Sequence, residues 1–265
     1  MNILRHYLLA VQFFTRIPVT GRLAEWVGFS PALLRASAAH FPGVGWLVGA
    51  MVASLSAGLF MVLPPGPFTP LVVAVLGTVA GVLITGAFHE DGLADVADGL
   101  GGSPERARAL VIMKDSRVGA FGAIALVLVL LTKVSLLALI GSAQPSVMVW
   151  GLFAAHVASR SYPLLTIRTM VHVGDDAGSK SKPLADQIGL AGLAWALAWL
   201  VAALALVVLA GAGVPLAVPM ACATLAWLWM WRWFQRRLQG FTGDCLGATQ
   251  QVCEVAFYLG LALSL

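Results

Sequence analysis

Residues 118–141 read VGAFGAIALVLVLLTKVSLLALIG, and Lys133 is the only charged side chain in this run. A helix of about 20 mainly apolar residues is long enough to cross the roughly 30 Å hydrocarbon core of a bilayer. No other structure satisfies all of its backbone polar groups within one segment of this length. The run therefore predicts a transmembrane helix, and with it an all-α membrane protein.

Similar apolar runs occur along the rest of the chain. Hydrophobic residues make up 60% of the 265 residues and charged residues 11%, whereas a soluble domain carries about 25% charged residues. We expect one integral membrane domain over residues 1–265, a polytopic bundle with about seven spans. The predicted spans are residues 43–63, 68–88, 118–141, 146–165, 189–210, 214–231 and 247–265.

An amphipathic segment precedes the first span. Wound as a helix, Asn2, Arg5, Gln12 and Arg16 fall near one face, and Pro18 ends the segment. This pattern predicts an N-terminal interfacial helix. A helix packed against the bundle is an equal alternative.

The distribution of charge between the spans predicts the orientation. Residues 64–67, 142–145 and 211–213 contain no charged residue, whereas the other connections hold nearly every Lys and Arg, including Lys180 and Lys182. The positive-inside rule places these basic connections in the cytoplasm, and we expect a multi-pass protein of the cytoplasmic (inner) membrane. The net charge of +4 is scattered, with no dense basic stripe, so membrane lipid is the expected partner and nucleic acid is not.

An acidic motif follows the second predicted span. Residues 89–99 read HEDGLADVADG, which places Asp91, Asp95 and Asp98 at i, i+4 and i+7, on one face of a helix. Carboxylates alone suit Mg²⁺ or Mn²⁺, and we expect a magnesium site there, with Glu90 as a further ligand. A solvated acidic loop is the plain alternative.

Other polar groups could extend this site. Two cations and an acid stand beside a glycine-rich turn, an arginine lies near the end of the fourth span, and a polar turn precedes the seventh. These residues are Lys114, Asp115, Arg117, Arg160, Thr242 and Asp244. A membrane anchor or an ordinary turn explains each of them equally well. Lys133 and Glu254 are costly inside spans, and the sequence shows no partner for Lys133.

Three of these segments together resemble the cobalamin synthase family, the adenosylcobinamide-GDP ribazoletransferases. The resemblance is carried by residues 89–99, by 113–119 (MKDSRVG) and by 242–248 (TGDCLGA), with FTRIP at 14–18 and FPGVG at 41–45. It extends from end to end of the chain. It implies a Mg²⁺-dependent membrane enzyme in which a ribose hydroxyl of α-ribazole, or of its 5′-phosphate, attacks adenosylcobinamide-GDP. GMP leaves, and adenosylcobalamin or its 5′-phosphate forms.

The implied chemistry gives the polar residues roles. Mg²⁺ on the acidic motif would hold the pyrophosphate, and Lys114, Arg117 and Arg160 would neutralise phosphate oxygens. We expect Asp98 to act as general base, with His89 as a second base or as an orienting group. A homo-oligomer and an association with other cobalamin-pathway enzymes are both open.

Two other classes of protein share part of this pattern. A CDP-alcohol phosphotransferase also places acids and Mg²⁺ on membrane helices, but Asp95 and Val96 stand where its Ala-Arg pair is expected. A transporter would carry its charges near the midplane, often within repeats. We detect no repeat, and most acids lie toward one face.

Overall fold

The computed structural model describes residues 2–174 and 187–265, so Lys180 and Lys182 lie outside the described residues. The described part is helical, and its only extended pairing is an isolated bridge between His172 and Phe241. The helices are α1 (Asn2–Phe14), α2 (Gly21–Val27), α3 (Pro31–Ser37), η1 (Ala38–His40), α4 (Phe41–Val62), α5 (Thr69–Thr85), α6 (Phe88–Gly102), α7 (Arg106–Ile112), α8 (Ala120–Ala143), α9 (Pro145–Ser159), α10 (Tyr162–Thr169), α12 (Leu190–Leu209), α13 (Ala217–Arg237) and α14 (Gly243–Ala262).

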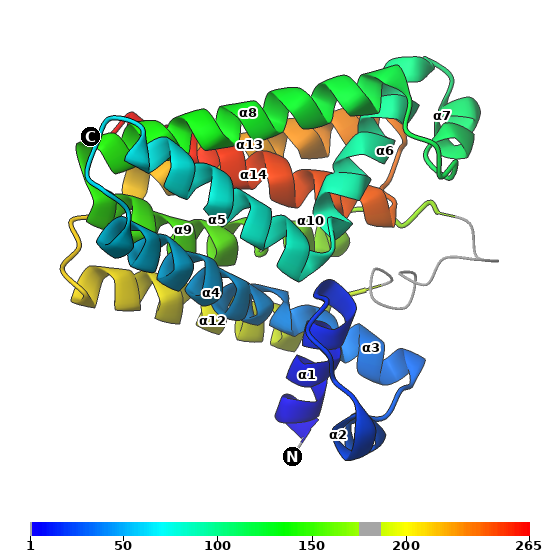
Figure 1. Ribbon diagram of the computed structural model, residues 1–265. Helices are drawn as coiled ribbons and strands as arrows, with labels where there is room; N and C mark the ends of the chain where they lie inside the picture. The colour runs from blue at the N-terminus through cyan, green and yellow to red at the C-terminus, as the bar shows by residue number, and fades with distance from the viewer. Residues whose placement is uncertain (1, 175–186) are drawn as a thin grey trace.

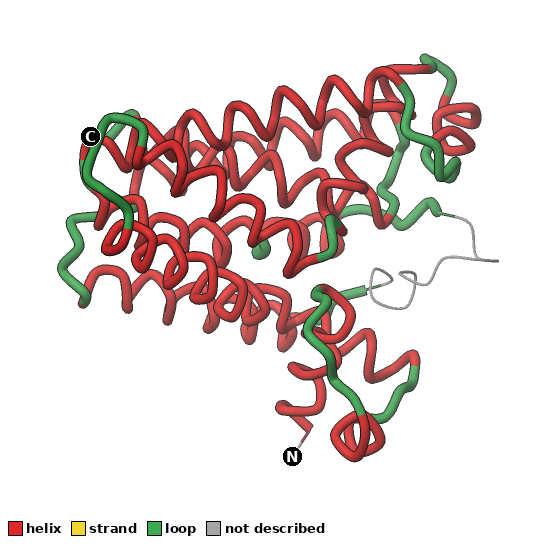
Figure 2. Tube along the Cα trace, in the orientation of Figure 1, coloured by secondary structure: helices red, strands yellow, loops and turns green. Residues whose placement is uncertain are grey.

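The long helices α4, α5, α8, α9, α12, α13 and α14 run along one common axis (Figures 1 and 2). The connections α4–α5, α8–α9 and α12–α13 lie at one end of this bundle with the C-terminus, and none of them carries a charged residue. Helices α6 and α7 lie at the opposite end, and α1 to α3 lie beside it (Figure 1). The bundle thus separates uncharged from charged connections, as the sequence predicted.

The predicted number of spans is met in part. Among the described residues, three segments are long and apolar enough to cross a membrane: Pro31–Val62, Ala120–Ala143 and Leu190–Leu209. A fourth counts if the bent pair α5 and α6 forms one span. The fourth predicted span, residues 146–165, is divided, because α9 ends at Ser159 and α10 begins at Tyr162. The count of about seven remains a prediction.

Glycines bring α4 close to α9. A Cβ atom on Gly45 would lie 2.8 Å from Val157 Cα, and one on Gly49 would lie 3.1 Å from the Phe153 carbonyl oxygen. Small residues four apart let two membrane helices approach backbone to backbone, which strengthens their van der Waals contact. This contact fixes the centre of the bundle.

A sharp turn separates α5 from α6. Gly86 and Ala87 take positive φ angles of 68° and 59°, which ends α5, and the two helices meet at 90°. A side chain on Gly86 would collide with Arg16, whose backbone N–H donates to the Ile84 carbonyl oxygen at 2.7 Å. Helix α6 therefore lies across the end of the bundle instead of continuing along its axis (Figure 1).

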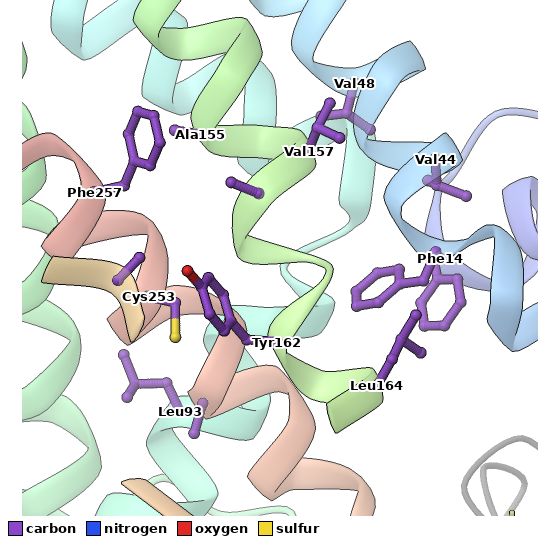
Figure 3. Close-up of a cluster of buried hydrophobic side chains, with 14 of the residues drawn as sticks. Phe14, Val44, Val48, Leu93, Ala155, Val157, Tyr162, Leu164, Cys253 and Phe257 are labelled. Atoms are coloured by element: carbon purple, nitrogen blue, oxygen red, sulfur yellow. The ribbon is translucent and has the colours of Figure 1, made fainter. Parts of the chain in front are cut away.

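The core joins helices that are distant in the sequence. Figure 3 shows buried side chains of α1, α4, α6, α9, α10 and α14 in one cluster. Phe14 of α1 stacks on Phe41 of α4, with ring centroids 4.2 Å apart. The N-terminal helix is thus packed against the bundle through one face, which agrees with the packing alternative. Its position relative to a membrane interface stays a prediction.

Candidate active site at the end of the bundle

The acidic motif forms most of α6, and α14 brings the predicted site residue Asp244 next to it. Asp91 is exposed and Asp95 is half-buried, one turn further along the same face. Helix α14 begins against this helix, because Gly92 has no side chain: a Cβ there would lie 2.8 Å from the Asp244 carbonyl oxygen. The carboxylates of Asp91, Asp95 and Asp244 are close enough for their charges to interact. We call these three residues the acidic cluster.

The electrostatics of the acidic cluster are consistent with this proximity. Burial, followed by the negative charges of Asp244, Asp91 and Asp98, raises the pKa of Asp95 to about 7. Burial and the charge of Asp91 also raise the pKa of Asp244, although the Thr242 hydroxyl donates to its Oδ2 at 3.2 Å. A positive charge would stabilise these carboxylates.

Asp98 has a different environment from Asp91 and Asp95. Its Oδ2 accepts the backbone N–H of Gly119 at 2.7 Å, and its Oδ1 accepts that of Gly122 at 2.8 Å. Only 8% of the residue is exposed. The carboxylate thus caps the first turn of α8, whose N–H groups have no partner within the helix. Both oxygens of Asp98, which the sequence predicted as a metal ligand and as the general base, are engaged in holding α8 against α6.

Glu90 and His89 point into the bundle, away from the acidic cluster. Successive helical residues are about 100° apart, so neither shares the face of Asp91. Glu90 Oε1 accepts a hydrogen bond from Gln251 Nε2 at 3.0 Å, and His89 stacks on Phe41, with centroids 5.6 Å apart. The structure does not bring the predicted ligand Glu90, or the predicted base His89, to the other acids.

The basic segment lies next to α6. Asp98 fixes Gly119, and the segment carrying Lys114, Asp115 and Arg117 immediately precedes that residue. The Arg117 guanidinium pairs with the Asp115 carboxylate at 2.5 Å, and 86% of the Arg117 side chain is exposed. An exposed pair of this kind contributes little to stability. The guanidinium is thus accessible to a ligand near the C-terminal half of α6.

Arg160 lies inside the bundle, where 1% of it is exposed. Its Nη1 donates to the His156 carbonyl oxygen at 2.8 Å, and its guanidinium carbon lies 5.7 Å from the centre of the Phe41 ring. Arg160 therefore faces the interior of the bundle. Among the phosphate-binding residues predicted from the sequence, Arg160 is enclosed while Lys114 and Arg117 are exposed.

Sequence reasoning missed a buried polar network beneath the acidic cluster. Lys133 Nζ lies 2.6 Å from Glu254 Oε1, which supplies the partner that the sequence did not reveal. Gln250 and Gln251 connect this ion pair to Glu90. The sequence signal that could have revealed this network is the presence of opposite charges, Lys133 and Glu254, in two different predicted spans. Each of them is costly in a span when it is alone.

The acidic cluster meets the requirements of Mg²⁺ only in part. Within residues 2–174 and 187–265, no three His, Cys, Asp or Glu side chains are arranged as a ready-made metal site. Mg²⁺ commonly binds through one or two carboxylates, with water and substrate phosphates as its other ligands. Asp91, Asp95 and Asp244 are donors of this kind, so the donor set fits Mg²⁺ that arrives with a phosphate.

Comparison with known proteins confirms the resemblance seen in the motifs. A family model described as cobalamin-5-phosphate synthase matches residues 6–262. A protein of Albidiferax ferrireducens, named adenosylcobinamide-GDP ribazoletransferase, is 65% identical over 278 aligned positions that cover 99% of each chain. Proteins of the same name from Polaromonas naphthalenivorans and Leptothrix cholodnii are 61% and 46% identical, over 100% and 97% of this chain and 100% and 94% of theirs. No solved structure matches.

Proposed function

This chain belongs to the cobalamin-5-phosphate synthase family, and we propose that it joins adenosylcobinamide-GDP to α-ribazole or α-ribazole 5′-phosphate and releases GMP. The observation that carries this proposal is the acidic cluster. Two helices bring Asp91, Asp95 and Asp244 together at the charged end of an apolar bundle. A pyrophosphate substrate with a divalent cation is the ligand that such a cluster suits.

The reaction is a phosphoryl transfer. A ribose hydroxyl oxygen forms a bond to the phosphorus nearest the corrinoid, the bond from that phosphorus to the bridging oxygen breaks, and GMP leaves with that oxygen. The hydroxyl proton passes to a carboxylate. Most of the catalysis in such reactions comes from positioning and charge neutralisation.

The residues of this chain can divide these tasks. Asp91, Asp95 and Asp244 would hold Mg²⁺, which when bound neutralises the pyrophosphate and the departing GMP. The exposed Arg117 guanidinium would bind phosphate oxygens in place of Asp115. Asp98 holds α8 in place, and we therefore assign proton acceptance to a carboxylate of the acidic cluster rather than to Asp98.

The setting supports a membrane enzyme with its active site in the cytoplasm. The acidic cluster lies at the end of the bundle that carries the basic connections, which the positive-inside rule assigns to the inside. We propose the inner membrane as the location.

The direct test is turnover by the purified protein. With adenosylcobinamide-GDP, α-ribazole and Mg²⁺, the parent should release GMP, and EDTA should stop the release. Asp95→Asn should lower kcat by about 100-fold or more. Glu105→Gln is a matched control, because Glu105 is an exposed acid in the connection after α6 and should leave kcat unchanged. A fully active, folded Asp95→Asn protein would refute the role of the acidic cluster.

The same preparation separates the rival functions. Transfer from CDP-alcohols, with none from adenosylcobinamide-GDP, would assign the chain a different phosphotransferase activity. Uptake of a corrinoid into proteoliposomes without GMP release would identify a transporter.

A further inference from the structure

A chain of buried hydrogen bonds runs from the centre of the bundle to α6. Gln250, Gln251 and Glu254 on α14 are each at most 2% exposed. The Gln251 amide nitrogen lies 3.0 Å from Glu90 Oε1 and 3.1 Å from Gln250 Oε1. The Gln250 amide nitrogen lies 2.6 Å from Glu254 Oε2. The chain thus links Glu90 of α6 to Glu254, three turns from the start of α14.

The inner end of this chain is held from several sides. Lys133 of α8 pairs with Glu254 at 2.6 Å, and the Tyr258 hydroxyl donates to the same carboxylate oxygen at 3.0 Å. The Gln250 amide also donates to the Ser159 hydroxyl of α9 at 3.0 Å. Hydrogen bonds to a charged group are shorter and stronger than neutral ones. Glu254 therefore joins α8 to α14, and its neighbour in the chain of bonds, Gln250, adds α9.

The outer end of the chain orients the N-terminal half of α6. Asp91 follows Glu90, so holding the Glu90 carboxylate inward turns Asp91 about 100° away from it, toward the face of Asp95. The backbones of α6 and α14 meet at glycines, where a Cβ on Gly247 would lie 3.5 Å from Gly92 Cα. Glycine surfaces allow close approach but have no side chains to interlock, so the hydrogen bond from Gln251 orients the N-terminal half of α6 on α14, while Asp98 holds the C-terminal half against α8.

Stability alone does not account for so many polar groups. Burying them is unfavourable unless each is paired, and replacing a buried ion pair by apolar side chains of similar volume often leaves stability unchanged or increases it. Glu90 Oε2 and Gln251 Oε1 have no partner among the described residues. The network therefore contributes little to stability, but its hydrogen bonds hold α6 in a defined orientation.

We propose that Gln251, held through Gln250 by the Lys133–Glu254 ion pair, is a positioning residue for phosphoryl transfer at the acidic cluster. It acts through Glu90 and touches no substrate. This inference rests on the proposed function, because the reaction at the acidic cluster is what the positioning serves. A reacting group displaced by about 1 Å can lower a rate by about 100-fold, so a small rotation of α6 is sufficient.

The test compares Gln251→Met with Thr249→Val. Methionine keeps the length of glutamine but donates no hydrogen bond. Thr249 is fully buried on the same helix, and its hydroxyl donates to the Cys245 carbonyl oxygen of that helix. Per folded molecule, Gln251→Met should lower kcat at least tenfold and leave the KM for adenosylcobinamide-GDP within about threefold. Thr249→Val should keep kcat within twofold of the parent.

A second readout does not depend on turnover. Amide hydrogens of α6 should exchange at least fivefold faster in Gln251→Met than in Thr249→Val, while those of α8 exchange equally in both. A parent that releases no GMP would refute the proposed function but leave this exchange comparison to judge the positioning role. Equal kcat in the two variants, or equal exchange in α6, would overturn the inference.

If Gln251→Met does not fold, a milder variant provides the test. Ser159→Ala removes only the hydroxyl that accepts from the Gln250 amide. It should lower kcat at least threefold relative to Thr249→Val, again with little change in KM. A Ser159→Ala protein as active as Thr249→Val would then overturn the inference.

Discussion

Asp98 of α6 accepts the backbone N–H of Gly122 in the first turn of α8, with 2.8 Å between Oδ1 and the nitrogen. A side chain on Gly122 would collide with this carboxylate, so the glycine is what allows the contact. The hydrogen bond connects the acidic helix to the basic segment that leads into α8. It makes Asp98 a structural link between two parts of the site.

Asp98→Asn should therefore reduce stability more than chemistry. The amide keeps one oxygen and presents an NH₂ group to a backbone N–H, so we expect a loss of about 1–3 kcal/mol in the free energy of unfolding. kcat per folded molecule should stay within about tenfold of the parent. Thermal unfolding in detergent and GMP release measure the two effects. The general-base role requires the opposite result, unchanged stability with a loss of about 10²–10⁴ in kcat.

The contact between α4 and α9 gives a prediction with an internal control. Gly45→Ala places a methyl group against the backbone of α9, and overpacking of this kind lowers stability by about 1–3 kcal/mol. Gly58→Ala is on the same helix with nothing within 4 Å of the new methyl group. It should be neutral or slightly stabilising, because alanine favours helix. Equal midpoints of thermal unfolding would contradict the close approach.

The ion pair between Lys133 and Glu254 predicts a non-additive double variant. Lys133→Met leaves a buried carboxylate without its cation and should lower the free energy of unfolding by about 3–5 kcal/mol. Adding Glu254→Gln removes the unpaired charge and should recover most of that loss. A double-mutant cycle on thermal unfolding measures the coupling. Additive losses would mean that the two side chains do not interact.

The acidic cluster predicts how stability depends on pH in the absence of divalent metal. Folding raises the pKa of Asp95 from 3.8 to about 7, so the folded protein binds more protons than the unfolded chain between these values. Stability contributed by this group is complete below about pH 4 and falls as the pH rises toward 7. Thermal unfolding in EDTA from pH 4 to 8 should show this decline, and Asp95→Asn should flatten it.

Asp115 is the matched control for that measurement. Its pairing with Arg117 lowers its pKa to about 2, so its contribution to stability is lost only as the pH falls below about 4. Asp115→Asn should therefore leave the slope between pH 5 and 8 unchanged. If both variants reduced the slope of stability against pH equally, Asp95 would not be the cause of the pH dependence.

The sequence predicted the helices and their order because apolar runs, glycines and prolines are local signals. It also predicted that residues 89–99 form a helix bearing acids on one side, because helical spacing follows from the backbone. The predicted ends of two spans are wrong, because packing between helices decides them. The fourth predicted span divides around Arg160, and the second ends at Gly86, where a positive φ turns the chain through 90°.

The sequence by itself determined the class of the protein, the separation of charge between its two ends, and its family, since composition, periodicity and motifs are properties of the chain alone. Only the tertiary structure decided the function of each acid within the motif. Asp91 and Asp95 meet Asp244, Asp98 caps α8, and Glu90 joins a network that ends at Lys133. These differences arise because neighbouring residues on one helix face different partners, and those partners come from segments far apart in the sequence.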